Sequence, residues 1–261
     1  MKEVKTIVLR AEGSSGITET VTAFKKAGSN VDLAHINKLK RKEKPLEDHQ
    51  ILCIAGSSAY GDYISAGKIL AVKLKYALGK DIKKFIDDGK LVLGICNGFQ
   101  SLIKLGLLPA VDGFSVKQDA TITLNDIGHF IDRWVYLKRE NKGKCVFTKE
   151  MKDTIYLPVN HAEGKFVADK TVIQRLEEND QIVFKYVDPD GNYADFPWNP
   201  NGSIDNIAGI CNPEGNVFGL MPHPEKFIHK WMHPNWTRND LPEEGDGFRI
   251  FKNAVEFAKK L

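Results

Sequence analysis

Residues 91–100 are Leu91-Val92-Leu93-Gly94-Ile95-Cys96-Asn97-Gly98-Phe99-Gln100. The first five form a short, continuously apolar run, and residues 99–107 then have the apolar spacing of a helix. A strand that is apolar on both sides is typical of a parallel sheet whose two faces are covered. The cysteine lies where the strand turns into the helix, so this stretch predicts both a fold class and the place of a reactive side chain.

The same alternation of strands and helices extends towards the N-terminus. We expect strands at residues 5–9, 30–36 and 50–55, and helices at 18–26, 64–80 and 82–88. Strands and helices in this order predict an α/β protein with an open, mostly parallel sheet and helices on both faces.

The second half of the chain is less regular. Strands are expected at 121–123, 133–139, 182–187, 207–211 and 218–221, and a helix at 247–260 closes the chain. There is no internal repeat, low-complexity segment or linker that would divide the sequence. We therefore expect residues 1–261 to form a single domain.

Composition excludes several classes of protein. Of 261 residues, 42% are hydrophobic and 27% charged, as in an ordinary globular protein. A net charge of +3 is weak evidence for binding nucleic acid, and the basic run at 38–44 is interrupted by Glu43 and has no interleaved aromatic residue. The apolar runs are far shorter than the roughly 20 residues that cross a membrane. The N-terminus does not resemble a signal peptide, so we expect a cytoplasmic protein. We expect it to bind neither nucleic acid nor a membrane.

The four cysteines, at positions 53, 96, 145 and 211, contain no Cys-x-x-Cys pair, and we expect no metal site. Cys96 differs from the others because it lies in Gly-x-Cys-x-Gly between a strand and a helix, the cysteine form of a nucleophile elbow. The helix N-terminus favours its thiolate, and the backbone N–H of Asn97 is placed to stabilise an oxyanion. The alternative is a buried structural cysteine beside two turn glycines.

A base for this cysteine is predicted in Met221-Pro222-His223-Pro224-Glu225, directly after the last expected strand. The carboxyl end of a strand is where an open α/β sheet places its site. His223 can take the thiol proton, and Glu225 can orient the imidazole and stabilise its charged form. Without the elbow, the same residues would be interpreted as a proline-rich surface loop.

Together the two stretches resemble the class I glutamine amidotransferases, which carry a Cys-His-Glu triad on a flavodoxin-like sheet. Within that class the chain is most similar to the glutaminase subunits of phosphoribosylformylglycinamidine synthase, from Leu9 to about Phe257. Besides the elbow, the segments that carry this likeness are Asn199–Ser203, Asn206–Val217, Gly219–Glu225, Arg133–Val135, Leu157–Val159 and His161–Phe166.

The resemblance implies a catalytic triad of Cys96, His223 and Glu225 that hydrolyses L-glutamine to glutamate and ammonia through a γ-glutamyl thioester. It implies that Gln100 contacts the glutamine substrate. It also implies a second oxyanion donor in the loop after residues 50–55, and Gly56 is the best candidate.

The resemblance also implies partners. The chain contains no Gly-x-x-x-x-Gly-Lys-Ser/Thr phosphate loop, so no cofactor is expected in it. ATP and Mg are expected on a synthetase subunit, which would use the ammonia to convert formylglycinamide ribonucleotide to formylglycinamidine ribonucleotide in purine biosynthesis. A small third subunit belongs to the same assembly in that family.

The loop around Gly56 departs from the family pattern Pro-Gly-Gly-Phe-Ser-Tyr-Gly-Asp, because Ala55, Ser57, Ser58 and Ala59 occupy its first, third, fourth and fifth places. Ser15 stands where the family usually has asparagine. A second glycine would adopt positive φ more easily than Ser57. We therefore expect glutaminase activity to be low until a partner sets this loop.

Three questions stay open. His161 and Glu163 could line the active site, lie at a subunit interface or cap a strand. The chain could be a cysteine hydrolase of the related protease and deglycase kind, although that class does not call for Gln100 or Glu225. It could also be a catalytically weak regulatory subunit, which the departures near Gly56 favour and the intact triad opposes.

Overall fold

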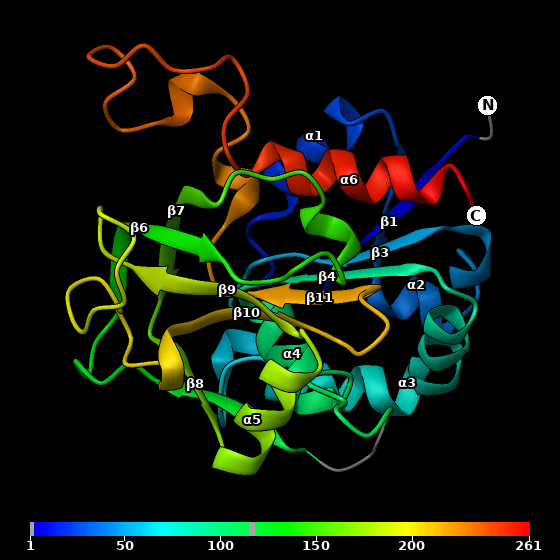
Figure 1. The fold of residues 1–261 in the computed structure, drawn as a ribbon. Helices are drawn as coiled ribbons and strands as arrows, with labels where there is room; N and C mark the ends of the chain where they lie inside the picture. Colours follow the sequence, from blue (N-terminus) through cyan, green and yellow to red (C-terminus); the bar gives the residue numbers. More distant parts are fainter. Residues whose placement is uncertain (1–2, 115–117) are drawn as a thin grey trace.

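The structure, a computed structural model, describes residues 3–114 and 118–261. In these ranges a nine-stranded sheet forms the centre of the molecule, with strand order β2-β1-β3-β4-β11-β10-β9-β6-β7 (Figure 1). The strands of this sheet are β1 (Lys5–Arg10), β2 (Asn30–His35), β3 (Ile51–Ile54), β4 (Leu91–Ile95), β6 (Ile131–Arg139), β7 (Thr154–His161), β9 (Ile182–Val187), β10 (Ile207–Cys211) and β11 (Val217–Leu220).

The sheet has a parallel half and an antiparallel half. Strands β2, β1, β3, β4 and β11 run parallel to their neighbours. From β11 onward the pairs with β10, β9, β6 and β7 are antiparallel. The expected open α/β sheet is confirmed. It is a mixed sheet, and the parallel half contains β4, the strand that ends at Cys96.

Helices cover both faces of the sheet, as the alternation of elements predicts (Figure 1). On one face α1 (Ile17–Lys26) and α6 (Phe248–Ala258) lie together, and the rings of Phe24 and Phe251 meet edge to face with centroids 4.9 Å apart. The other face carries α3 (Lys68–Asp87), α4 (Asn97–Leu105) and α5 (Lys170–Glu178). A short helix α2 (Ile36–Lys40) follows β2. Burial on both faces explains why the central strands are apolar throughout.

Short elements complete the fold and carry several residues of interest. A separate two-stranded sheet pairs β5 (Ala120–Leu124) with β8 (Glu163–Ala168) in antiparallel fashion. Single turns of 3-10 helix lie after β3, at η2 (Ala59–Asp62), and after β11, at η5 (Pro224–Lys226). The remaining 3-10 turns are η1 (Leu46–Asp48), η3 (Val146–Thr148), η4 (Ile204–Asn206) and η6 (Lys230–Met232).

Two features differ from the sequence prediction. The helices expected at 64–80 and 82–88 are one helix, α3, which begins only at Lys68 because Gly67 before it has a left-handed conformation with φ 75°. Strands β7 and β8 and helix α5 were not predicted. Pro158 lies within β7 and cannot donate to a strand ladder, but β7 is an edge strand and tolerates it. Helix α5 buries only Leu176, so its apolar pattern is weak.

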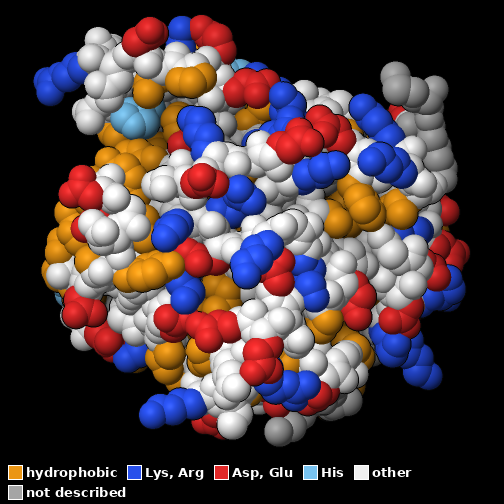
Figure 2. Space-filling model, viewed as in Figure 1, with side chains coloured by type: hydrophobic (Ala, Val, Ile, Leu, Met, Phe, Trp, Pro, Cys, Tyr) orange, Lys and Arg blue, Asp and Glu red, His pale blue; other side chains and the backbone are white. Residues whose placement is uncertain are grey.

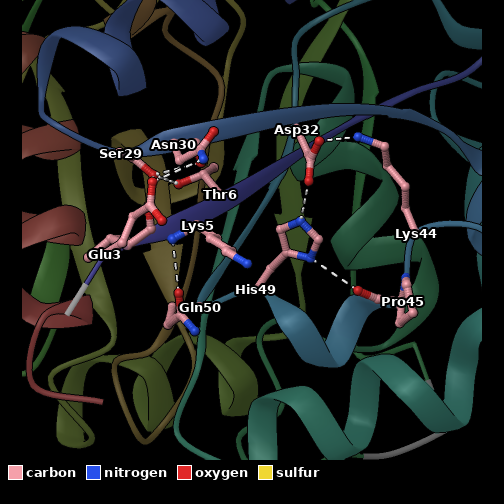
Figure 3. A network of polar contacts seen from close by, with 11 residues as sticks. Glu3, Lys5, Thr6, Ser29, Asn30, Asp32, Lys44, Pro45, His49 and Gln50 are labelled. Carbon is pink, nitrogen blue, oxygen red and sulfur yellow. Dashed lines mark hydrogen bonds and ion pairs between the residues drawn. The ribbon is translucent and has the colours of Figure 1, made fainter.

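A polar network fixes the outer end of the parallel half, between β1, β2 and the segment that leads into β3 (Figure 3). The buried imidazole of His49 contacts Asp32 on β2 at 3.0 Å and the carbonyl of Pro45 at 3.1 Å. Lys44 pairs with the same carboxylate. Its ammonium group holds the pKa of Asp32 below its usual value, despite partial burial. These contacts stabilise the edge strand β2, which has a sheet neighbour on one side only.

The surface seen in Figure 2 carries basic and acidic side chains in close mixture. Among the described residues, no helix is both long enough and apolar enough to span a membrane.

Candidate active site

Three neighbouring parallel strands, β3, β4 and β11, end at the same edge of the sheet and bring Gly56, Cys96 and His223 together. A Cβ atom built on Gly56 would lie 3.5 Å from Cβ of Cys96 and 2.5 Å from Cε1 of His223. The carboxyl edge of a parallel sheet is where α/β proteins place their sites. The structure therefore brings together residues that the sequence separates widely.

Cys96 has the strained backbone expected of a nucleophile elbow. Its φ is 49° and its ψ is −105°, and its N–H donates to the carbonyl of Leu220 at 2.8 Å. Its side chain is 5% exposed, and the thiol contacts the carbonyl of Asn160 at 3.9 Å. A bulky residue with positive φ costs free energy that the surrounding packing must supply, and such strain is concentrated at functional sites.

The two glycines of the motif allow helix α4 to approach the sheet closely. A Cβ atom on Gly98 would lie 2.0 Å from the carbonyl oxygen of Ile54 in β3. One on Gly94 would lie 2.5 Å from Cδ1 of Leu102. Neither glycine has positive φ, so close packing, and not backbone conformation, requires them.

His223 and Glu225 form a buried pair just after β11. Nδ1 of His223 lies 2.6 Å from Oε1 of Glu225, and the two side chains are 3% and 0% exposed. The backbone N–H of His223 donates to the carbonyl of Pro158 in β7 at 2.8 Å, which anchors the loop across the sheet edge. Nε2 of His223 is buried without a partner that meets hydrogen-bond geometry, so it is available for proton transfer.

The charge state of His223 follows from its surroundings. Burial lowers the pKa of the imidazole, but the Glu225 carboxylate and the charge of Cys96 act in the opposite direction and raise it to about 10. At neutral pH the imidazole is therefore protonated. A buried imidazolium next to a cysteine stabilises the thiolate, which is the nucleophilic form.

Gly56 lies against the imidazole ring of His223. Since the built Cβ atom would be 2.5 Å from Cε1 and 3.0 Å from Nδ1 of His223, any side chain here must displace the imidazole. The carbonyl of Gly56 accepts a hydrogen bond from the N–H of Gly16 at 2.9 Å, which limits how far the loop can move away.

We expect Gly56→Ala to reduce the rate of the reaction catalysed at Cys96 by about 100-fold, because displacements near 1 Å at a catalytic group have effects of this size. Gly79→Ala is the matched control, since Gly79 lies in helix α3 with nothing within 4 Å of its built Cβ. That change should leave the rate unaltered and stabilise the fold by up to about 1 kcal/mol. Steady-state kinetics and thermal unfolding of both variants provide the measurement. Equal rates for the two variants would contradict the assignment of Gly56 to the site.

Asn97 and Gln100, on the first turn of α4, belong to a polar network beside the elbow. The Asn97 amide donates to Oδ1 of Asp62 and to Oε1 of Gln100, both at 2.9 Å. Gln100 in turn donates to the carbonyl of Glu163 at 2.6 Å. Both side chains are almost fully buried. The backbone N–H of Asn97 has no acceptor in the described part of the chain, so it is free for a ligand.

The sequence analysis assigned no role to Asp62 or to the side chain of Ser57, and it left the role of Glu163 open. Asp62 accepts from Asn97, Ser57 donates to Oδ1 of Asn97 at 3.2 Å, and the Glu163 carboxylate accepts from the N–H of Ala66 at 2.9 Å. Partial burial raises the pKa of Asp62. Only the proximity of Asp62 and Ser57 to Gly56 in the sequence could have suggested them.

The structure shows the backbone conformation of the loop in which the residues around Gly56 depart from the family pattern. Ser57 does not adopt positive φ, so the glycine that the family usually has at this place is not required here for backbone conformation. The positive φ values in this loop lie further on, at Tyr60, Gly61, Asp62 and Ile64. Nothing in the structure explains Ser15.

The described residues contain no group of three or more His, Cys, Asp or Glu side chains placed to hold a metal ion.

Comparison with known proteins supports the class that this fold and site define. Residues 3–258 match the family described as the CobB/CobQ-like glutamine amidotransferase domain. The chain therefore belongs to this glutamine amidotransferase family.

The chain is also similar along its whole length to individual relatives. It is 43% identical over 264 residues to phosphoribosylformylglycinamidine synthase subunit PurQ from Dehalococcoides mccartyi, covering 100% of both chains. It is 42% identical over 274 residues to subunit PurQ from Archaeoglobus fulgidus, covering 100% of this chain and 99% of the other. Identity at this level places the chain within the PurQ family of glutamine amidotransferases.

Solved structures of similar proteins agree with this family assignment. A chain from the structure of PurLQS from Thermotoga maritima has a TM-score of 0.74 and 27% identity, covering 98% of this chain and 99% of that one. A glutamine amidotransferase from the same organism, at 16% identity, has a TM-score of 0.60 over the full length of both chains and shares the fold.

Proposed function

We propose that this chain hydrolyses L-glutamine to glutamate and ammonia, as the glutaminase subunit of a phosphoribosylformylglycinamidine synthase. The observation that carries the proposal is the strained Cys96 at the carboxyl end of β4, beside the buried His223–Glu225 pair that follows β11. A cysteine, an imidazolium and an orienting carboxylate form the set that acyl transfer through a thioester requires.

In the first half of the reaction the Cys96 thiolate attacks the side-chain carbonyl carbon of glutamine. The S–C bond forms, the C–N bond breaks, and the His223 imidazolium gives its proton to the leaving nitrogen, which departs as ammonia. In the second half His223, now neutral, takes a proton from water, and the resulting hydroxide cleaves the thioester to glutamate. The thiolate and the imidazolium are regenerated, so charge and protons balance over the cycle.

The oxyanion that forms at each addition step needs hydrogen-bond donors. The unpaired backbone N–H of Asn97 is one donor, and the backbone N–H of Gly56, in the loop that follows β3, is the second. Gln100 contacts the glutamine substrate from the first turn of α4. Because its side chain is held by Asn97 and Glu163, it offers the substrate a fixed amide.

We propose that the ammonia passes to an ATP- and Mg-dependent synthetase subunit, which converts formylglycinamide ribonucleotide to formylglycinamidine ribonucleotide, and that a small third subunit joins the assembly. The names of the relatives support the reaction, and the PurLQS structure supports an assembly with PurL and PurS partners. In this assembly ATP and Mg bind the synthetase, and this chain carries no cofactor of its own.

The test is release of glutamate from glutamine by the purified chain, with and without the candidate synthetase and small subunits. We expect slow release by the chain alone and a clear increase in the complex, as predicted from the departures of residues 55–59 from the family pattern. Release that does not depend on partners would contradict partner activation. No release under either condition would contradict the glutaminase proposal and favour a regulatory subunit.

A further inference from the structure

The buried histidine at the end of β7 lies beside the active site and has no part in the mechanism described above. The residue before it, Asn160, contacts the Cys96 thiol through its carbonyl at 3.9 Å. His161 itself is 4% exposed, and it is close enough to His223 for their charges to interact. The residue next to it in β7 therefore contacts the thiol, and its own ring lies in the electrostatic surroundings of His223.

Hydrogen bonds determine which nitrogen of His161 carries the proton. The amide nitrogen of Asn125 donates to two carbonyl oxygens, of His161 at 2.9 Å and of His129 at 3.1 Å. The amide of Asn125 is thereby oriented, and its Oδ1, 3.1 Å from Nδ1 of His161, can only accept. Nδ1 must carry the hydrogen, so Nε2 presents a lone pair.

That lone pair has no partner. Nε2 of His161 is buried and accepts no hydrogen bond from the described residues. The ring is also held in place, because it lies against Gly164, where a built Cβ atom would be 2.0 Å from Cε1 and 2.6 Å from Nε2. A buried acceptor without a donor is unfavourable, so a fixed, unpaired acceptor in the surroundings of His223 indicates a ligand that donates.

The surroundings keep this imidazole uncharged. Burial lowers the pKa of His161 to about 3, and the nearby His223 cation acts in the same direction. A neutral imidazole of this kind accepts hydrogen bonds but cannot protonate a base. The ligand that suits it is a small neutral donor, and the proposed reaction releases one, ammonia, at Cys96, whose thiol contacts the residue before His161.

We propose that Nε2 of His161 accepts a hydrogen bond from the ammonia released at Cys96 and holds it unprotonated on its way to the synthetase subunit. The proposal rests on the proposed glutaminase function. Ammonium has no lone pair to attack with, so a site that binds ammonia without protonating it preserves the nucleophile that amination needs.

The first test uses the complete complex and compares two substitutions of His161. In His161→Gln a side-chain amide oxygen can reach the Nε2 position, whereas His161→Asn leaves only the shorter amide near Asn125. His129→Asn is the matched control, because the His129 side chain is exposed and its carbonyl accepts from the same Asn125 amide. The measured quantity is the amount of ribonucleotide aminated per glutamate released.

For His161→Asn we expect this ratio to fall about threefold to tenfold, the effect of losing one hydrogen bond. His161→Gln should recover at least half of the ratio, and the control should match the unsubstituted complex. Amination with ammonium chloride in place of glutamine should be unchanged in all of them. An unchanged ratio in His161→Asn, equal effects of both substitutions, or a parallel loss of glutamate release and amination would overturn the proposal.

A second measurement needs no substitution. In the unsubstituted protein labelled with ¹⁵N-histidine, Nε2 of His161 should give the signal of an unprotonated nitrogen, and that signal should move as ammonium chloride is added at alkaline pH. Potassium chloride should leave it in place. A protonated Nε2, or no response to ammonia, would overturn the proposal. This result does not depend on glutamine hydrolysis, so it separates failure of this inference from failure of the glutaminase proposal.

Discussion

Replacement of Cys96 by alanine is expected to lower the rate of glutamate release from glutamine by at least about 10⁴-fold, because in the proposed mechanism the acyl intermediate forms on its thiol. Amination by the complex with ammonium chloride as nitrogen source should continue, since that route does not use the thiol. The substitution should not unfold the chain. Alanine removes one sulfur atom, and its Cβ atom fits the space that Cys96 already occupies.

Cys145→Ala is the matched control for this experiment. Cys145 is also a free, buried cysteine, but it lies before the 3-10 turn η3, away from the carboxyl edge of the parallel strands. Its replacement should leave glutamate release unchanged. Equal losses in the two variants would indicate a general effect of cysteine removal, and full activity of Cys96→Ala would exclude the thioester mechanism.

The isosteric substitution Glu225→Gln is expected to reduce kcat by about 10²–10⁴-fold near pH 8 and to change its dependence on pH. In the unsubstituted protein burial is the largest single influence and lowers the pKa of His223, but the Glu225 carboxylate and Cys96 together outweigh it and raise the pKa to about 10. In Glu225→Gln the neutral amide no longer stabilises the charged imidazole as the carboxylate does. Burial then has the larger influence, and the pKa of His223 falls. In the proposed mechanism the imidazolium is the general acid, so the variant should lose activity at a lower pH on the alkaline side than the unsubstituted protein.

The raised pKa of His223 also determines how the stability of the fold depends on pH. The pKa of His223 is raised on folding, so the stabilisation from its pairing is complete below the unfolded value of 6.5 and is lost as pH rises towards about 10. The free energy of unfolding should therefore differ less between pH 6 and pH 10 in Glu225→Gln than in the unsubstituted protein, as measured by denaturant unfolding. Glu177→Gln, at an exposed position of α5, is the isosteric control and should alter neither profile. A pH profile of Glu225→Gln that coincides with the unsubstituted protein would contradict the pairing.

Much of this site could be predicted because its signals are local in the sequence. A continuously apolar strand, a cysteine between two glycines and a helix occupy one uninterrupted stretch, and each preference is set by neighbouring residues. His223 and Glu225 are similarly recognisable, because two prolines and the strand before them restrict the backbone. The order of elements is enough to predict an open α/β sheet with helices on both faces.

Other features depend on contacts between distant segments, and the sequence alone does not determine them. Strand β7 contains Pro158 and is stable only because β6 pairs with it on one side and the other side is a free edge. The positions of Asp62 and Ser57 around Asn97 depend on how closely α4 packs against β3. No local pattern encodes such approaches.

The sequence by itself determined the fold class and, through the resemblance of several segments, the family, and it predicted a nucleophile and its base. It could do so because strand and helix periodicity and the elbow motif are properties of short segments. Only the tertiary structure decided the charge of His223 and the close contact of Gly56 with its imidazole. It also decided the tautomer of His161 and left its Nε2 without a hydrogen-bond partner. The physical reason is that pKa values and hydrogen-bond satisfaction depend on burial and on partners brought together from separate strands. Those partners exist only once the sheet has formed.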